Sequence, residues 1–239
     1  MISNITYKLS TFSNYSFLSY NKNDVIKVLS VFDDPTLAPG TMQEIHFDGV
    51  VSQRMQFVAQ NGLFVMVINS DRIDISLTSN EREGFSKAKI PEIVEELTKS
   101  MEKLFSVFED RVSIPNRLAW NTSYVYFDIS EDEKKLFRAR FLKDLEFFEN
   151  SRLDDTVIRY AGQREAIIEN QLEKINVLAT INSYVTDPGT EIEINGFRID
   201  YDINTWQGNR LNRFHSPGIK EFVDKAVLLQ NELNNEILP

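Results

Sequence analysis

QFVAQNGLFVMVINSDRIDISLTS, residues 56–79, holds two turn signals on either side of a short apolar run. Asn61-Gly62 is the dipeptide that a two-residue type I′ turn favours, and Ser70-Asp71 offers a second tight turn. The stretch therefore predicts three antiparallel strands joined by hairpins. These turns fix which residues lie opposite each other: Val58 and Val65, Phe57 and Met66, Val67 and Asp74, Ile68 and Ile73.

Because side chains alternate along a strand, the predicted three-stranded sheet has two different faces. One face is wholly apolar and belongs to a core: Phe57, Ala59, Phe64, Met66, Ile68, Ile73, Ile75 and Leu77. The other face is polar at its margins and apolar along its middle, where it carries Val58, Leu63, Val65 and Val67 beside Asp74. Full burial of this face would cost free energy because the Asp74 carboxylate would be unpaired, and full exposure would leave a row of aliphatic side chains in water. We therefore expect partial cover, from a helix of this chain or from a partner.

Other segments have the apolar periodicity of amphipathic helices. The longer ones are residues 90–109, residues 130–148 and residues 216–237, and a shorter helix is predicted over residues 25–32. Their ends carry the expected signals, with Pro91 and Pro217 in first turns, a capping box from Ser130 to Glu133, and Asn23 or Asp24 as the cap of the short helix.

Strand-like segments fill much of the remaining chain. They are residues 2–20, 41–48, 116–130, 156–168 and 173–185, followed by a hairpin over residues 190–206 that turns at Asn195-Gly196, whereas TLAPG at residues 36–40 reads as a loop. Strands that come in runs favour an antiparallel-rich α+β fold over a doubly wound sheet. We expect about seven to nine strands with three to four amphipathic helices. Residues 1–239 are interpreted as a single α+β domain, with a weak subdomain seam near residues 113–116.

The composition excludes several kinds of site. The 239-residue chain has no cysteine and only two histidines, His46 and His215, which excludes disulfides, thiolate zinc sites and multi-histidine metal sites. A formal net charge of −10 disfavours broad attraction to nucleic acid or to anionic membranes. No apolar run is long enough for a membrane span and no signal peptide is seen, so we expect a cytoplasmic protein.

The predicted hairpin at Asn195-Gly196 would gather charges on one face: Glu191, Glu193, Arg198, Asp200 and Asp202. Glu193 opposite Arg198 is a favourable pair, but Glu191 opposite Asp200 is unfavourable unless solvent or a cation intervenes. The face is interpreted either as a Mg²⁺ or Ca²⁺ site or as solvated charges on a half-exposed antiparallel sheet. The solvated interpretation is favoured.

A second cluster is basic and lies on the predicted helix at residues 130–148: Lys134, Lys135, Arg138, Arg140 and Lys143. Phe137 and Phe141 between these residues have core spacing, and acidic neighbours dilute the positive field. The cluster therefore predicts a solvated helix face rather than a nucleic-acid contact. The chain has no Walker loop, no G-x-G-x-x-G, no G-x-S-x-G and no H-E-x-x-H, so no catalytic residue, metal ligand or cofactor is assigned.

Three segments resemble an uncharacterised prokaryotic protein family of about this length: INSDRIDIS at 68–76, IRYAGQREAIIEN at 158–170 and NRFHSPGIKEFVDKA at 212–226. Together they cover less than half of the chain, and none is a catalytic motif. The resemblance implies an α+β fold and carries no functional residue.

Three hypotheses about function follow. The first is a non-enzymatic cytoplasmic interaction or assembly protein, a prokaryotic or phage accessory, that binds a protein partner or itself through Val58, Leu63, Val65, Val67 and Asp74. The alternative is a divalent-metal-dependent hydrolase that uses Glu191, Asp200 and Asp202. The third is a nucleic-acid-associated protein that binds through the Lys134–Lys143 helix, which the net charge makes the least favoured.

Overall fold

A computed structural model of the chain describes residues 2–79, 90–109, 111, 114–127, 130, 132, 136, 157–186 and 194–237. The strands are β1 (Ile2–Phe12), β2 (Leu37–Ile45), β3 (Val51–Ala59), β4 (Phe64–Ile68), β5 (Arg72–Ser79), β6 (Arg117–Phe127), β7 (Val157–Ile168), β8 (Gln171–Thr186) and β9 (Ile194–Thr205). The helices are α1 (Lys22–Phe32), α2 (Ile90–Val107) and α4 (Ser216–Ile237).

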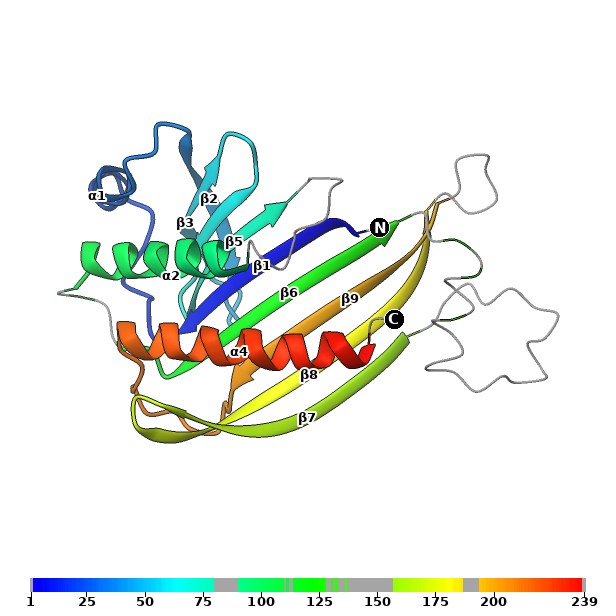
Figure 1. Cartoon of the computed structure of the whole chain (residues 1–239). Helices are drawn as coiled ribbons and strands as arrows, with labels where there is room; N and C mark the ends of the chain where they lie inside the picture. The colour runs from blue at the N-terminus through cyan, green and yellow to red at the C-terminus, as the bar shows by residue number, and fades with distance from the viewer. Residues whose placement is uncertain are drawn as a thin grey trace.

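All the strands belong to one nine-stranded sheet, in the order β2-β3-β4-β5-β1-β6-β9-β8-β7, and every neighbouring pair is antiparallel (Figure 1). With three helices in the described part of the chain, the structure confirms the antiparallel-rich α+β class. Strands β1 and β6 lie side by side near the middle of the sheet although more than a hundred residues separate them in the chain.

The meander predicted from residues 56–79 forms in the expected register. Phe57 is opposite Met66 and Val58 opposite Val65, and on the next pair of strands Val67 is opposite Asp74 and Ile68 opposite Ile73. The first turn differs from type I′ because only Gly62 has a positive φ, of 69°. The Asn61 side chain instead accepts a hydrogen bond from Leu63 N at 3.0 Å. The loop between the strands is also longer than the predicted two residues, because β3 ends at Ala59, β4 begins at Phe64 and Gly62 N donates to Ala59 O at 2.7 Å. The turn is nevertheless centred on Asn61-Gly62, so the predicted register holds.

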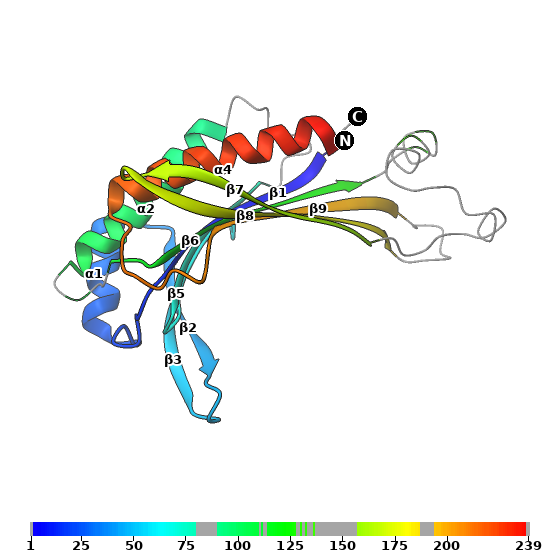
Figure 2. The ribbon, with the colours of Figure 1, turned by 90° about the horizontal axis from the view of Figure 1, so that it is seen from below.

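The helices cover one face of the sheet. Helix α2 contacts β1 and β5, α4 contacts β6, β7 and β9, and α1 packs against α2. Figure 2 shows α2 and α4 on the same side of the sheet, with β2 and β3 turned away toward the opposite side. The face that carries α2 and α4 is the wholly apolar face predicted from the sequence, and we call the other one the helix-free face.

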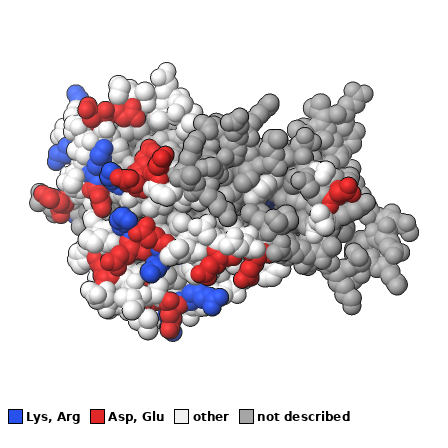
Figure 3. Space-filling view, in the orientation of Figure 1, with Lys and Arg blue, Asp and Glu red and all other residues white. Residues whose placement is uncertain are grey.

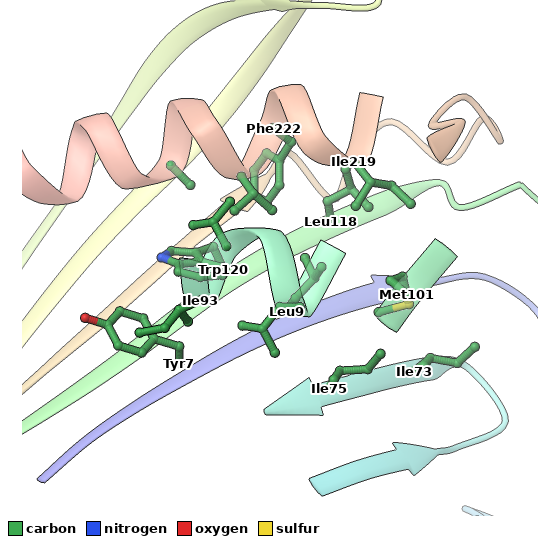
Figure 4. Close-up of a cluster of buried hydrophobic side chains, with 14 of the residues drawn as sticks. Tyr7, Leu9, Ile73, Ile75, Ile93, Met101, Leu118, Trp120, Ile219 and Phe222 are labelled. Carbon is green, nitrogen blue, oxygen red and sulfur yellow. The ribbon is translucent and has the colours of Figure 1, made fainter. Parts of the chain in front are cut away.

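The core fills the space between the sheet and the helices (Figure 4). Leu9, Ile75 and Trp120 from the sheet meet Ile93, Met101 and Phe222 from α2 and α4, and the exposed fraction of each is at most 4%. Complete burial of one such aliphatic or aromatic side chain stabilises the fold by about 1.5–3 kcal/mol. The spacing of these residues on the helices is the 3.6-residue period that predicted them.

Charged side chains cover the outer side of the helices. Figure 3 shows acidic and basic residues intermixed over this surface, viewed from the side of α2 and α4. The helices therefore present an ordinary solvated exterior on that side, as expected for amphipathic helices that bury one stripe.

Two local predictions are wrong. TLAPG at residues 36–40 was predicted as a loop, but β2 begins at Leu37 and pairs with β3 through Pro39, opposite Phe57. Proline is tolerated here because β2 is an edge strand, where one side of the backbone needs no partner. The short helix is also capped by Asn21, whose side chain accepts from Asp24 N at 2.9 Å, instead of by Asn23 or Asp24.

The predicted hairpin at Asn195-Gly196 is also wrong. Residues 194–205 form one continuous strand, with Asn195 opposite Val185 and Gly196 opposite Tyr184 on β8. A strand that pairs on both sides has no room for a turn within it, so the local Asn-Gly signal is overridden by pairing with β6 and β8. Glu191 and Glu193 lie outside the described residues.

Candidate functional site

The predicted interaction patch lies on the helix-free face. Val58, Leu63, Val65 and Val67 are all half-buried, and α2 and α4 lie on the opposite face of the sheet (Figure 2). Partial cover of these side chains was expected, and their burial agrees with it. The cover does not come from either long helix, because both pack against the other face.

Asp74 is buried within this face, where it has one hydrogen-bond donor and one ion-pair partner. Ser10 Oγ donates to Asp74 Oδ1 at 2.6 Å, and Arg72 Nε lies 2.8 Å from Asp74 Oδ2. Arg72 also lies over the Phe12 ring, with its guanidinium carbon 5.9 Å from the ring centroid. A paired carboxylate removes the energetic objection to burial that the sequence raised, because the charge keeps hydrogen-bonding partners when water is excluded.

The hairpin between β2 and β3 carries an exposed apolar group that the sequence analysis missed. We call it the apolar tip: Ile45, Phe47, Val50 and Val51. Phe47 is fully exposed, and the exposed fractions of Ile45, Val50 and Val51 are 74%, 56% and 53%. Ile45 lies opposite Val51 on the same face as buried Met55, so the tip continues the apolar face beyond the reach of the helices. Figure 2 shows this hairpin projecting from the rest of the molecule.

The loop at the tip has a defined conformation. His46 N donates to Val50 O at 2.8 Å, Gly49 N donates to His46 O at 2.9 Å, and the Asp48 side chain accepts from Val50 N at 3.0 Å. Gly49 has a φ of 81°, a left-handed value that glycine adopts without steric cost. The signal available in the sequence was Asp48-Gly49 flanked by apolar residues, which is a hairpin signature.

A largely buried ion pair anchors the hairpin just behind the apolar tip. Arg54 Nε donates to Glu44 Oε2 at 2.5 Å, and Arg54 Nη1 donates to Ser16 O at 3.0 Å. Glu44 Oε1 accepts from Ser70 Oγ at 2.7 Å and from Ser70 N at 3.2 Å. Burial by itself raises the pKa of Glu44, but the hydrogen bonds from Ser70 and Arg54 outweigh it and hold that pKa below its ordinary value. The hairpin is thereby tied to two other parts of the chain.

The predicted acidic face is only partly within the described chain. Arg198, Asp200 and Asp202 share the helix-free side of β9, where Arg198 Nε donates to Asp200 Oδ1 at 2.8 Å. Asn204 Nδ2 donates to Asp202 Oδ1 at 3.0 Å, so each carboxylate has a partner within its own strand. Asp200 lies opposite Thr180 and Ser123, so the predicted pairing with Glu191 is wrong.

Metal ligands are not gathered in the described part of the chain, where no group of three or more histidine, aspartate or glutamate side chains is placed to hold an ion. The residues of the predicted basic cluster all lie outside those that the structure describes: Lys134, Lys135, Arg138, Arg140 and Lys143.

Both histidines have local partners. His46 Nε2 lies 2.7 Å from Ser52 Oγ, across the hairpin. His215 Nδ1 lies 3.3 Å from Glu169 Oε2, and Glu169 Oε1 accepts from Gly218 N at 3.2 Å in the first turn of α4. Carboxylates are favourable at a helix N-terminus, so this contact is best understood as a cap of α4.

A polar network lies inside the core beneath α4, where the sequence indicated only an apolar stripe. Gln230 Oε1 accepts from Trp120 Nε1 and from Thr122 Oγ1, each at 2.9 Å, and Gln230 Nε2 donates to Tyr124 OH. Burial raises the pKa of Tyr124 above its ordinary value and keeps the phenol neutral. This network stabilises the packing of α4 against β6.

No helix in the described ranges combines the length and apolar character needed to cross a membrane. Comparisons with protein-family models, with curated proteins and with solved structures gave no match.

Proposed function

We propose that this chain is a non-enzymatic cytoplasmic interaction protein that binds a partner protein through the apolar tip. The observation that carries the proposal is the full exposure of Phe47 on a hairpin that Arg54 and Glu44 anchor just behind the apolar tip. Clustered exposed apolar side chains mark interaction sites, and large aromatic anchors dominate the energetics of interfaces.

The chemistry of the tip favours a protein with an apolar pocket. Ile45, Val50 and Val51 are exposed aliphatic side chains of the same short hairpin as Phe47, so a partner with a pocket for the ring would meet apolar surface beside it. The hydrogen bonds of the loop fix its shape before binding, which reduces the conformational entropy lost on association. A formal net charge of −10 disfavours an anionic membrane as the alternative surface.

The helix-free face beside the hairpin supports the same function as a secondary contact. Val65 and Val67 are half-buried there without cover from α2 or α4. A partner that seats Phe47 and reaches around β3 would complete their burial. Replacing both with Lys is therefore expected to weaken binding less than a change at Phe47, because their side chains are already partly removed from water.

The test compares Phe47→Asp with Leu211→Asp. Leu211 is a matched control because it is also a strongly exposed apolar side chain, with an exposed fraction of 73%, on a different part of the surface. Proteins captured from cell extract by the parent chain and by Leu211→Asp, but lost with Phe47→Asp, are purified and their Kd is measured. We expect a loss of at least about tenfold for Phe47→Asp, with an unchanged thermal melt.

The proposal is contradicted if Phe47→Asp binds the purified partner as tightly as the parent. It is also contradicted if the parent, and not Phe47→Asp, cosediments with vesicles of neutral phospholipid, because the tip would then be a membrane anchor. Both measurements use the full chain.

The other two hypotheses gain no support from the described residues. A hydrolase that uses Glu191, Asp200 and Asp202 loses the pairing on which it rested, and Asp200 and Asp202 already accept hydrogen bonds from Arg198 and Asn204. Nucleic-acid binding through the Lys134–Lys143 segment stays a prediction, because that segment lies outside the described residues.

A further inference from the structure

Strand β7 forms the edge of the sheet opposite to β2, and it is built as a long, regular strand. All twelve of its residues pair with β8 without a register shift, from Val157 opposite Asn182 to Ile168 opposite Gln171. In the described part of the chain no strand pairs with its outer side, and Figure 1 shows it outermost. A regular edge strand is a template for another strand, because its outward backbone N–H and C=O groups can pair with one.

The two edges of the sheet differ in how they are protected. Strand β2 contains Pro39, which removes a backbone donor from that edge. Strand β7 has no proline and no bulge, and it carries exposed aliphatic side chains near both ends, with exposed fractions of 61% at Val157 and 64% at Ile167. These features make β7 the edge that can accept a strand.

We propose that two copies of this chain form a dimer by antiparallel pairing of β7 with β7 of the second copy, about a two-fold axis at Gly162. The pairing joins two nine-stranded sheets into one continuous sheet. It leaves the two apolar tips at the far ends, because β2 and β7 are opposite edges. The dimer is therefore independent of the function proposed for the tip.

The charges of β7 are self-complementary in this register. With Gly162 opposite its own copy, Arg159 lies opposite Glu165, and the axis generates this ion pair twice. Opposite charges directly across an antiparallel pair stabilise it, and like charges in the same positions destabilise it. The same register places exposed Val157 opposite exposed Ile167, so the apolar ends cover each other.

Neighbouring registers lose these matches. An axis at Ala161 would place Val157 opposite Glu165, and an axis at Gln163 would place Arg159 opposite Ile167. A pairing centred between two residues would set the helix-covered face of one copy beside the helix-free face of the other, whereas a two-fold axis perpendicular to the sheet keeps each face on the same side. Gly162 is therefore the centre that satisfies both the charges and the aliphatic ends.

Within the described residues, no other feature of the structure requires glycine at position 162. Its φ is not positive, and a Cβ added there would meet nothing within 4 Å. Glycine weakens a strand interior and often marks a place where another backbone approaches closely. A second copy that pairs at this residue supplies that backbone.

The surface beside β7 also suits a second copy. A groove of ≈ 300 Å³ runs between β7 and α4, and its lining includes Arg164, Glu232 and Glu236. In the proposed register Arg164 of one copy lies opposite Tyr160 of the other, on the side of the sheet that carries α4. Tyr160 of the second copy lines the same groove as Glu232 and Glu236 of that copy, so these two glutamates lie near the incoming guanidinium and favour it electrostatically.

The first experiment measures mass in solution by light scattering and sedimentation from about 1 to 100 µM, the range expected for a small edge interface. We expect concentration-dependent doubling of the mass for the parent chain. Arg159→Glu alone and Glu165→Arg alone place like charges opposite each other and should give monomers. The double variant Arg159→Glu/Glu165→Arg exchanges the charges and should restore the dimer. Arg198→Glu, on β9, is the matched control and should remain dimeric.

The second experiment uses the absence of cysteine from the chain. Gly162→Cys places one thiol opposite its copy, at the Cα separation of about 4.5–5.5 Å that antiparallel pairs have and that a disulfide accepts. Mild oxidation should give a covalent dimer on a non-reducing gel, whereas Leu211→Cys should stay monomeric.

A mass that stays monomeric at 100 µM overturns the dimer. A dimer that persists in both single charge variants, or that is lost in the charge-exchanged double variant although the fold is retained by circular dichroism, overturns the register. If Phe47→Asp abolishes the dimer, then self-association occurs through the apolar tip instead, and the β7 proposal fails while the tip retains a binding role.

Discussion

Gln230 shows how a single polar residue inside the core holds a helix in one position. Its side chain is 2% exposed and connects Trp120, Thr122 and Tyr124 of β6 to α4. A purely apolar face of α4 could pack against β6 in several similar positions, but the Gln230 amide finds its hydrogen-bond partners in only one of them. A fully bonded polar group in a core is therefore a determinant of packing specificity as well as of stability.

Gln230→Ala removes the acceptor of two buried donors and leaves a cavity beneath α4. We expect the free energy of unfolding to fall by about 2–4 kcal/mol, as measured by urea denaturation. Asn235→Ala is the matched control, because Asn235 is an exposed amide on the same helix and its loss should change stability by less than about 0.5 kcal/mol. Equal effects of the two substitutions would contradict the role of the buried network.

Glu44 makes the stability of the folded chain depend on pH. Because its pKa in the folded chain is lower than in the unfolded chain, its stabilising effect is fully present above the unfolded pKa. That effect is lost as pH falls through the lower, folded pKa, where the carboxylate becomes protonated in both states. Glu44→Gln should therefore be less stable than the parent at pH 7.

The gap in unfolding free energy between the parent and Glu44→Gln should shrink as the pH is lowered from about 6 to 3. Urea denaturation over that range measures it. A gap that is constant with pH would show that the substitution acts through packing and not through the charge.

Residue-level predictions succeeded where neighbours in the chain decide the outcome. The register of Val58 with Val65 and of Val67 with Asp74 follows from the positions of the two turns. The hydrogen bond from Ser10 to Asp74 could not be predicted, because Ser10 lies on a strand more than sixty residues away. A contact of that kind depends on which strands become neighbours.

At the scale of elements, the connection from β9 to α4 depends on one buried ion pair. Arg213 Nε donates to Glu173 Oε1 at 2.6 Å, Arg213 Nη2 donates to Glu173 Oε2 at 3.0 Å, and both side chains are 6% exposed. Arg213 also donates to the backbone oxygens of Asn209 and Leu211, each at 3.0 Å. A forked pairing of this kind fixes direction as well as distance.

Arg213→Met leaves the carboxylate of Glu173 buried without its cation, so we expect a loss of about 3–5 kcal/mol in unfolding free energy. The double variant Arg213→Met/Glu173→Leu removes both charges and should recover much of that loss. Lys220→Met breaks the exposed pair with Asp224 on α4 and serves as the control, with a change below about 1 kcal/mol. A double variant that is no more stable than Arg213→Met would contradict the explanation.

Elements were predicted best when their apolar period was long and uninterrupted. Helices α2 and α4 appear where the 3.6-residue period predicted them, because one continuous stripe has one way to be buried. The β2–β3 hairpin was missed in part because Pro39 and Gly40 read as a loop. The apolar tip was missed because exposed Phe47 and Ile45 look, in sequence, like any strand residues that face a core.

At the scale of the whole molecule, the helices stabilise the sheet unevenly. Strands β1, β6 and β9 lie beneath α2 and α4, whereas the outer part of β2 and β3 projects beyond them (Figure 2). Opening of a region costs less free energy where fewer apolar side chains are buried. The sheet should therefore open first at the β2–β3 end.

Hydrogen exchange followed by mass spectrometry tests this gradient. Peptides from β1 and β6 should exchange last, near the rate set by global unfolding, and peptides from β2 should exchange sooner. If the dimer forms as proposed, protection of β7 should rise with protein concentration while that of β2 stays constant. Uniform exchange across all strands would contradict the gradient.

The fold class, the register of the central meander and the faces of the long helices could be predicted from the sequence, because each depends on periodicity and turn position within a short stretch of chain. The place of Asn195-Gly196 inside a strand could not, since pairing of β9 with β6 and β8 outweighs a local turn preference. The same holds for the position of Val58, Leu63, Val65 and Val67 on the helix-free face, and for the extension of the β2–β3 hairpin beyond α2 and α4. Which apolar side chains stay exposed depends on the reach of the covering helices, and that is a property of the assembled fold.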